Sequence, residues 1–342
     1  MLKKKLGLFI ALALMVTMIA GCSQSGKKAE TANANDKKPI IMKVGHAHNI
    51  DTPRHQSYLK FKELVEQRTN NGVKVEIFPS GQVGDEVAMI EATKLGTLQG
   101  TRGGPFEKMA PEFMIYTLPF LFDNLDGIEK ITMGPIGDRI AKAAEKNGFV
   151  ALTTGDGGGF RNISNNKRPI VTPDDMKGLK IRTPGIESII KTMEAFGANA
   201  VSIPFGDVYM ALKTNVADGQ ENPPVNMESM KIYEVQKYIS VIEYQFHPDP
   251  FIVNLKWFQS LSPEYQKILK ECAVESMKLN DKLIKEANQK AMDNMKKSLE
   301  VMVLTPEQRN AFKEKVKPVY DYYINKGVCT QKDIDEIRNA TK

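Results

Sequence analysis

Two arginines and one asparagine are the side chains of this sequence best suited to hold a small anion. Arg161 stands in the motif GGFRN, Arg182 in KIRTP and Asn222 in GQENP. A guanidinium group presents a planar fork of donors that matches a carboxylate with two parallel hydrogen bonds, and an amide can donate as well as accept. The competing interpretations are a structural salt bridge for Arg182 and an exposed strand position for Arg161. The residue types favour recognition of a carboxylate.

The stretch 178–224 supplies the elements that would position these groups. Lys180–Arg182 is predicted to be a short strand, followed by a proline-containing turn and a helix whose apolar residues recur at helical spacing. A second strand at 200–203 and a second helix follow, and 218–224 is expected to be a turn. Ligands of open α/β sheets bind beyond the carboxyl ends of the strands. The stretch therefore gathers a cation, an aromatic ring and an amide at one edge.

Motifs along nearly all of the chain resemble those of the extracytoplasmic solute-binding proteins of TRAP transporters, the DctP-type family. Within the stretch these are K-I-R-x-P, P-F-x-x-x-Y-x-A-L-x-T and V-x-D-G-Q-E-N-P. Upstream are VKVEIFPSGQVGDE at 73–86, LPFLF at 118–122 and GGFRNISNNKRPI at 158–170, and downstream is KIYEVQKYIS at 231–240. Each motif is short, but together they follow the family's order with family-like spacing.

The resemblance implies roles for five residues. Arg182 matches the arginine that selects the ligand carboxylate, and Arg161 matches a second arginine. Asn222 matches an asparagine that meets the same carboxylate, and Phe205 matches an aromatic residue that packs on the ligand. Glu86 matches an acidic position that meets hydroxyl groups in sugar-acid binders, although a carboxylate at a helix N-terminus is also stabilised by the helix dipole.

Four other positions are weaker candidates. Arg102 stands where the family usually has an uncharged residue, so it could meet a second anionic group or be exposed to solvent. Glu221 is flanked by matched residues and could face the ligand or point away. His46 and His48 share one strand face, which favours one of them in the pocket wall. We expect no metal site, because no third metal-binding side chain is apparent beside these two histidines. We also expect no cofactor. Ligand binding assisted by a bound cation, which the 2-oxo-acid branch of the family can use, stays open.

The first 38 residues are predicted to export and anchor the protein. Residues 1–21 carry a basic start and an apolar run too short for a membrane span, which is typical of a signal peptide. Small residues precede Cys22, which predicts a lipoprotein signal with Cys22 as the lipidated residue; an ordinary signal peptide or an uncleaved anchor is the alternative. Residues 22–38 lack large apolar side chains and are predicted to be a flexible tether.

Charge gives no indication of nucleic-acid binding. The chain has 47 basic and 41 acidic residues, and the leader contributes three of the basic ones, at positions 3–5. The exported part is therefore close to neutral, whereas nucleic-acid binding calls for a concentrated basic face. Cys272 and Cys329 could form a disulfide outside the cell or remain separate thiols.

The body from residue 39 is predicted to be an α/β protein of two domains, because it is longer than a usual single core. The resemblance implies that these domains form a two-lobe fold like that of periplasmic binding proteins. The resemblance assigns 39–158 and 248–288 to lobe one, and 159–247 and 289–342 to lobe two. A glycine-rich hinge is expected at 155–159, where the chain crosses between the lobes, and a loop holding His247 and Asp249 is expected near this crossing. One long helix from Pro263 to about Leu299 is expected to span both lobes. Single helices are expected at 125–146 and 306–324.

Export, paired arginines, two lobes and a hinge together indicate a binding module. The resemblance implies that it captures an organic acid, either a sugar acid such as a uronate or a C4-dicarboxylate, and delivers it to the membrane permease subunits of a TRAP transporter. We expect a monomer held by its lipid at the outer face of the cell membrane or in the periplasm. A ligand sensor that docks on a receptor is one alternative. A secreted enzyme acting on carboxylates is another, but no G-x-S-x-G, H-E-x-x-H or phosphate-binding motif is present, so we expect no catalytic residues.

Overall fold

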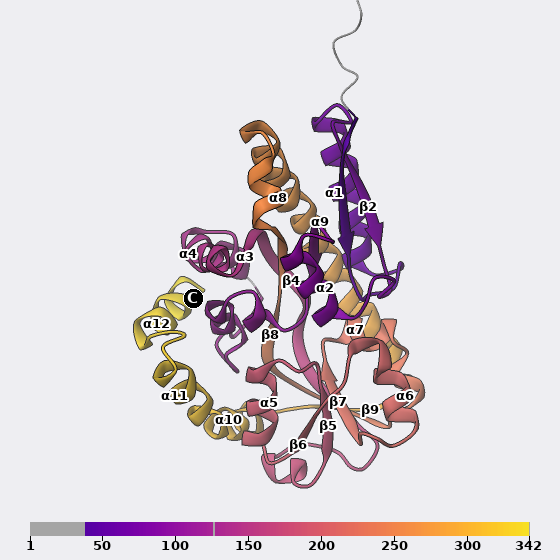
Figure 1. The fold of residues 1–342 in the computed structure, drawn as a ribbon. Helices are drawn as coiled ribbons and strands as arrows, with labels where there is room; N and C mark the ends of the chain where they lie inside the picture. The colour runs from indigo at the N-terminus through magenta and orange to yellow at the C-terminus, as the bar shows by residue number, and fades with distance from the viewer. Residues whose placement is uncertain (1–37, 126, 342) are drawn as a thin grey trace, which may run out of the picture. The chain divides into compact units, whose positions relative to one another are not determined.

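The computed structural model describes residues 38–125 and 127–341 of the chain. The expected signal peptide, Cys22 and the tether up to residue 37 lie outside these residues. The described part is built on one mixed sheet with the strand order β2-β1-β3-β8-β4-β7-β5-β6, and β9 pairs with β8. Helices cover the sheet, and Figure 1 shows its two ends joined by β4 and β8. The expected α/β class is confirmed.

One end of the sheet, called lobe one here, consists of parallel strands and the helices that connect them. Its elements are β1 (Ile40–Gly45), α1 (Pro53–Arg68), β2 (Val73–Phe78), α2 (Glu86–Leu95) and β3 (Gly100–Arg102). β1 pairs in parallel with both β2 and β3. Helix α1 has a capped start, because the Thr52 side chain accepts a hydrogen bond from the His55 backbone N–H and Pro53 occupies the first turn.

The other end, called lobe two, holds the stretch on which the sequence analysis centred. Its elements are β5 (Lys180–Thr183), α5 (Glu187–Ala195), β6 (Asn199–Ser202), α6 (Val208–Lys213), β7 (Gly219–Asn222) and α7 (Pro224–Ser229). The expected turn at 218–224 is wrong, since Gly219–Asn222 is a buried strand that pairs with β4 on one side and β5 on the other. Pairing on both sides overrides the turn preference of glycine, asparagine and proline.

Two strands of 17 residues each run through both lobes: β4 (Phe149–Asn165) and β8 (Tyr238–Asn254). They pair in antiparallel fashion, with a register shift between Asp156 and Phe160. The expected glycine-rich crossing is therefore a bulge inside one long strand, with positive φ at Gly158 and Gly159. His247 and Asp249 lie in β8, so the loop expected there is wrong.

The expected long helix is confirmed as α9 (Pro263–Met295). Its first half packs in the lobe-one core, where Cys272 and Met277 are buried, and its second half packs in the lobe-two core through Ala291 and Met295. Two of its asparagines bind the glycine bulge from the side. Asn280 Nδ2 donates to the Asp156 carbonyl at 2.6 Å and Asn288 Nδ2 to the Gly158 carbonyl at 2.7 Å. The helix thus braces both lobes at the crossing.

Figure 1 shows three of the remaining elements, α10 to α12, in a row along one side of the molecule. The elements not yet named are α3 (Ile128–Thr132), α4 (Pro135–Ala143), α8 (Leu255–Ser260), β9 (Glu300–Val303), α10 (Pro306–Lys315), α11 (Lys317–Asn325) and α12 (Gln331–Ala340). Short 3-10 turns lie at Phe106–Lys108, Pro111–Thr117, Ala144–Asn147, Pro173–Met176, Phe205–Asp207 and Ile232–Glu234.

Two of the expected helices are each broken into two. The helix expected at 125–146 breaks before Pro135, and the one expected at 306–324 breaks between α10 and α11 at Val316. In both cases a proline occupies the first turn of the new helix, where its missing N–H costs nothing. Cys272 and Cys329 are both free and buried, so the disulfide alternative is wrong.

Candidate functional site

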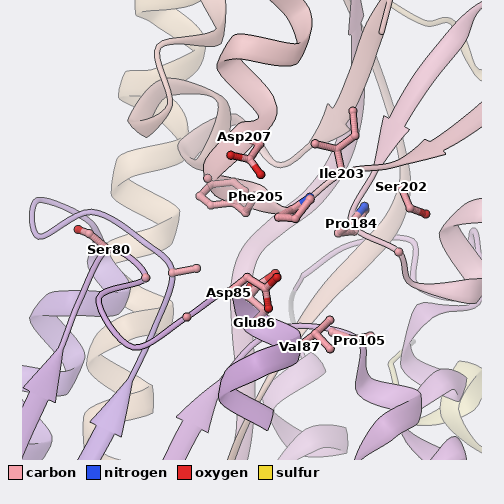
Figure 2. Close-up of a pocket in the computed structure, with 16 residues that line it drawn as sticks. Ser80, Asp85, Glu86, Val87, Pro105, Pro184, Ser202, Ile203, Phe205 and Asp207 are labelled. Carbon is pink, nitrogen blue, oxygen red and sulfur yellow. The ribbon is translucent and has the colours of Figure 1, made fainter. Parts of the chain in front are cut away.

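A pocket of about 400 Å³ lies between the two lobes, within the usual size range of small-ligand sites. Lobe one contributes Ala47, Ser80, Gly81, residues 84–87 and Pro105, and lobe two contributes Pro184, Gly185 and residues 202–207. Figure 2 shows Asp85, Glu86 and Val87 facing Pro184, Ile203 and Phe205 across the pocket. The lobe-two wall is built from the loops that follow β5 and β6, beyond the carboxyl ends of these strands, as the sequence analysis expected.

Arg182 lies on β5 directly behind this wall. Its side chain is fully buried, and its Nε donates to the carbonyl of the pocket residue Ile203 at 2.8 Å. Its Nη1 and Nη2 have no hydrogen-bond partner, and no carboxylate among the described residues forms a salt bridge with it. Burial lowers the pKa of Arg182 to about 10. Leaving two charged donors buried and unpaired is costly, so these atoms are suited to receive an anionic ligand group.

Arg161, on β4, is held by a dense network instead. Its Nε and Nη2 form an ion pair with the carboxylate of Glu221, with Nη2 at 2.8 Å from Oε1. Its Nη1 donates to His247 Nδ1 at 2.5 Å, and its Nη2 lies 3.3 Å from Asn222 Oδ1. The Tyr244 hydroxyl also donates to Glu221 Oε2 at 2.6 Å. The alternative that Arg161 is exposed is wrong, and Glu221 is its buried partner.

Strand pairing explains why these side chains meet. Arg182 lies beside Gln220 in the parallel β5–β7 pair, and Asn162 lies opposite Asn222 in the antiparallel β4–β7 pair. The two arginines and Asn222 therefore occupy three neighbouring strands. The Asn222 amide donates to Gln220 Oε1 at 2.7 Å, which leaves its Oδ1 facing Arg161. A direct contact of Arg161 or Asn222 with the ligand stays a prediction.

A second group of buried charges lies on the lobe-one side. Arg102 donates from Nε to Asp249 Oδ2 at 3.0 Å, from Nη2 to the same oxygen at 2.5 Å and from Nη1 to the Ser57 hydroxyl at 2.6 Å. It is 1% exposed, so the alternative of solvent exposure is wrong. Because all three of its nitrogens have partners, Arg102 has less capacity for a second anionic group than the sequence analysis expected.

Arg54 is a buried charge that the sequence analysis missed. It is 3% exposed in the first turn of α1, with its Nε 3.2 Å from Asp249 Oδ2. Its terminal nitrogens have no hydrogen-bond partner. A signal was present in the sequence, since Arg54 stands four residues before Tyr58 and seven before Phe61, on the stripe of α1 that faces the core.

Phe205 is the aromatic side chain in the wall of this pocket, and neither His46 nor His48 is among the residues that line it. Phe205 lines the pocket, and the ring of His48 stacks on it with centroids 4.7 Å apart. His46 stacks on Tyr58, and its Nε2 shares a hydrogen bond of 3.0 Å with His55 Nδ1. Burial, assisted by nearby Arg54, lowers the pKa of His46 to about 2, so the ring is neutral. No group of metal-binding side chains is found within residues 38–125 and 127–341.

Glu86 is the carboxylate best placed to meet a ligand from lobe one. It begins α2, lines the pocket and is half-buried. Burial raises its pKa, and the charges of Arg54 and Arg182 act in the opposite direction. A carboxyl group in this setting can accept a hydrogen bond from a hydroxyl, or donate one when protonated. Contact with a ligand hydroxyl stays a prediction.

The two lobes, the shared strands and the interlobe pocket define a solute-binding protein of the periplasmic-binding type. The chain belongs to family 7 of the bacterial extracellular solute-binding proteins, the DctP family, whose model matches residues 44–326. The resemblance found in the sequence is thereby confirmed. Among the described residues, no helix is long and apolar enough to cross a membrane.

Relatives of known name cover almost the whole chain. The 2,3-diketo-L-gulonate-binding periplasmic protein YiaO of Escherichia coli is 30% identical over 335 residues, which are 96% of this chain and 98% of YiaO. The C4-dicarboxylate-binding periplasmic protein DctP of Rhodobacter capsulatus is 34% identical over 290 residues, 83% of this chain and 86% of that protein.

Solved structures agree with the fold. A TRAP periplasmic solute-binding protein from Shewanella oneidensis with bound succinate has a TM-score of 0.84 and 29% identity, and covers 89% of this chain and all of its own. The sugar acid binding protein DctPAm from Advenella mimigardefordensis, in complex with galactonate, has a TM-score of 0.83 and 28% identity, covering 90% of this chain and 99% of its own.

Proposed function

We propose that this solute-binding protein captures an organic acid between its lobes by pairing the ligand carboxylate with Arg182. The observation that carries the proposal is the fully buried guanidinium of Arg182, whose Nη1 and Nη2 lack partners beside the pocket residue Ile203. Arg161, held by Glu221 on β4, contacts Asn222 on the strand between β4 and β5, which places both groups beside Arg182 as further candidates for ligand contact. Relatives and structural neighbours that bind dicarboxylates and sugar acids support a carboxylate ligand of one of these classes.

We further propose that the captured acid passes to the permease subunits of a TRAP transporter, and that the protein acts as a monomer without catalysis. The lipid on Cys22 would keep the pocket close to these subunits, with residues 22–38 as the tether. A single acyl chain binds membranes only marginally, so stable anchoring needs more than one chain. Membership of an extracellular solute-binding family supports this location.

A thermal-shift screen with matched ligands tests the proposal. Succinate, galactonate and galacturonate would be compared with succinamide, galactonamide and galactitol, which keep the carbon skeleton and lack the carboxylate. We expect the melting temperature to rise with at least one acid and with none of the uncharged compounds. An uncharged analogue that stabilises the protein as well as its acid would contradict carboxylate recognition. Recovery of the acid unchanged after long incubation would support binding without catalysis.

A further inference from the structure

The segment 222–229 connects the strand beside Arg182 with lobe one. It begins at Asn222, the last residue of β7, and β7 pairs with β5, the strand that carries Arg182. It continues as α7 and ends at Ser229, whose carbonyl accepts a hydrogen bond from Asn49 Nδ2 of lobe one at 3.0 Å. One short stretch of chain therefore joins the proposed anion site to a contact that separation of the lobes would break.

The long helix α9 fixes the middle of this segment to the glycine bulge of β4. Asn288 Oδ1 accepts a hydrogen bond from the backbone N–H of Val225 at 2.9 Å, and Asn288 Nδ2 donates to the Gly158 carbonyl at 2.7 Å. The N–H of Val225 lies in the first turn of α7, where it has no partner within the helix. One side chain of α9 thus holds the bulge and the start of α7 together.

Direct packing joins the bulge to the same segment. A Cβ atom placed at Gly158 would lie 2.9 Å from Pro223 Cβ, so the backbone of the bulge rests against the residue that follows Asn222. Asn226 is 4% exposed, and its Nδ2 donates to the Gly157 carbonyl at 3.4 Å. The bulge and the segment 222–229 are therefore expected to move as one body.

We propose that Asn288 is a positioning residue that couples ligand binding to closure of the lobes. It holds the segment 222–229 where its start keeps Asn222 beside Arg161 and its end presents the Ser229 carbonyl to Asn49. Asn288 is not among the residues that line the pocket, so it acts on the ligand only through this segment. The inference rests on the proposed function and adds a residue outside the pocket that sets the affinity.

This role predicts an energetic coupling between two side chains that do not touch the pocket. If Asn288 positions Ser229, the hydrogen bond of Asn49 contributes to affinity only while Asn288 is in place. Residues that act through one element give non-additive effects in a double-mutant cycle. Because the Asn49 contact forms when the lobes come together, its loss should appear mainly as a faster dissociation rate.

The test measures binding and dissociation kinetics for the wild type, the two single variants and the double variant. The probe is whichever of succinate, galactonate and galacturonate binds the wild type most tightly. Asn49→Ala should weaken binding by about three- to tenfold in the wild type, as expected for one hydrogen bond. In the Asn288→Ala background, the same substitution should weaken binding by less than about twofold.

A second variant and a matched control accompany the cycle. Asn288→Asp keeps the shape and the acceptor for Val225 but removes the donor to Gly158, so it should replace Asn288→Ala in the cycle with the same result, even where the alanine variant does not fold. Asn294→Ala is the control, since Asn294 lies on the same helix and donates to Glu228 Oε1 of α7 at 3.1 Å. It should bind the probe acid within about twofold of the wild type.

A merely structural Asn288 would lower the free energy of unfolding and leave the Asn49→Ala loss at its wild-type size. Equal losses in the two backgrounds, or no loss from Asn49→Ala in the wild type, would overturn the inference and leave the proposed function standing. A loss in Asn294→Ala as large as that in Asn288→Ala would also overturn it, because any contact between α9 and α7 would then suffice. A wider screen in which no acid binds would remove the proposed function and the inference with it.

Discussion

The ring of His48, after β1, stacks on the ring of Phe205, after β6, with centroids 4.7 Å apart and 18° between their planes. A second contact joins the same two lobes, because Asn49 Nδ2 donates to the Ser229 carbonyl at 3.0 Å. Together they hold lobe one against lobe two at the pocket. Separation of the lobes would break both contacts.

Ligand binding is expected to close the two lobes about the glycine bulge. Gly158, with φ of 155°, allows the backbone of β4 to bend where most residues could not. Small-angle scattering should show a smaller radius of gyration when a ligand from the screen is added at saturation. His48→Ala removes the ring stack and should weaken binding by about two- to tenfold. An unchanged scattering profile at saturation would argue against closure.

Stability is expected to depend on the protonation of Asp156, in the same bulge. Burial and the nearby Asp281 carboxylate raise the pKa of Asp156 to about 7. The folded protein thus holds a proton that the unfolded chain releases near pH 4, so this group's contribution to stability is complete below about pH 4 and is lost as the pH rises to about 7. Asp281, with a pKa raised to about 6, acts in the same direction.

Asp156→Asn isolates this effect from other titrating groups. The variant keeps an oxygen that can accept from the backbone N–H groups of Gly158 and Gly159, as the aspartate does. Its free energy of unfolding should match that of the wild type at pH 4 and exceed it at pH 8, as measured by urea denaturation. A difference that stays constant between pH 4 and pH 8 would contradict the account.

The Arg161–Glu221 pair is expected to be essential for folding stability. Glu221→Gln leaves a buried guanidinium with a weaker partner, and loss of one member of a buried pair costs about 3–5 kcal/mol. Urea denaturation at pH 7 measures this cost. Glu63→Gln is the matched control, because Glu63 pairs with Lys60 at the surface and should cost no more than about 1 kcal/mol. Similar losses for the two variants would mean that the buried pair has no special role.

Anchoring has a separate test, which concerns residues outside the described structure. Cys22→Ser is expected to leave an unprocessed precursor that incorporates no labelled fatty acid, because the thiol that receives the lipid is absent. Binding of the soluble ligand should be unchanged, since the pocket residues lie far along the chain. Equal labelling of the wild type and the variant would exclude lipidation at Cys22.

The sequence was sufficient for features that depend on local patterns. The short strand ending near Arg182, the capped helix after Thr52 and the long helix from Pro263 follow from spacing, caps and periodicity, which act within a few residues. The position of Phe205 at the pocket wall follows from its place after a strand. Arg182 and Phe205 lie at or just after the ends of strands, and the order of strands and helices along the chain is enough to predict that such residues lie near the pocket.

Other features depend on pairing between distant segments and could not be read from local pattern. Glu221 meets Arg161 only because β4 and β7 pair in antiparallel register, which places residues 60 positions apart side by side. The same pairing turns an apparent turn at 218–224 into a strand. Arg54 was missed for a different reason, since an arginine on an amphipathic helix is ordinarily assigned to the exposed face.

The central claim is that Arg182 binds the ligand carboxylate with both arms of its guanidinium group, and calorimetry on two variants tests it most directly. Arg182→Ala should fold and lose about thirtyfold to several-thousandfold in affinity for the best acid of the screen, because the ligand charge would be stranded in a closed site. Arg182→Lys should recover only part of the affinity that Arg182→Ala loses, since an ammonium group keeps the charge and lacks the planar fork of donors. Binding by Arg182→Ala within about threefold of the wild type would contradict the claim and make Arg182 a structural residue.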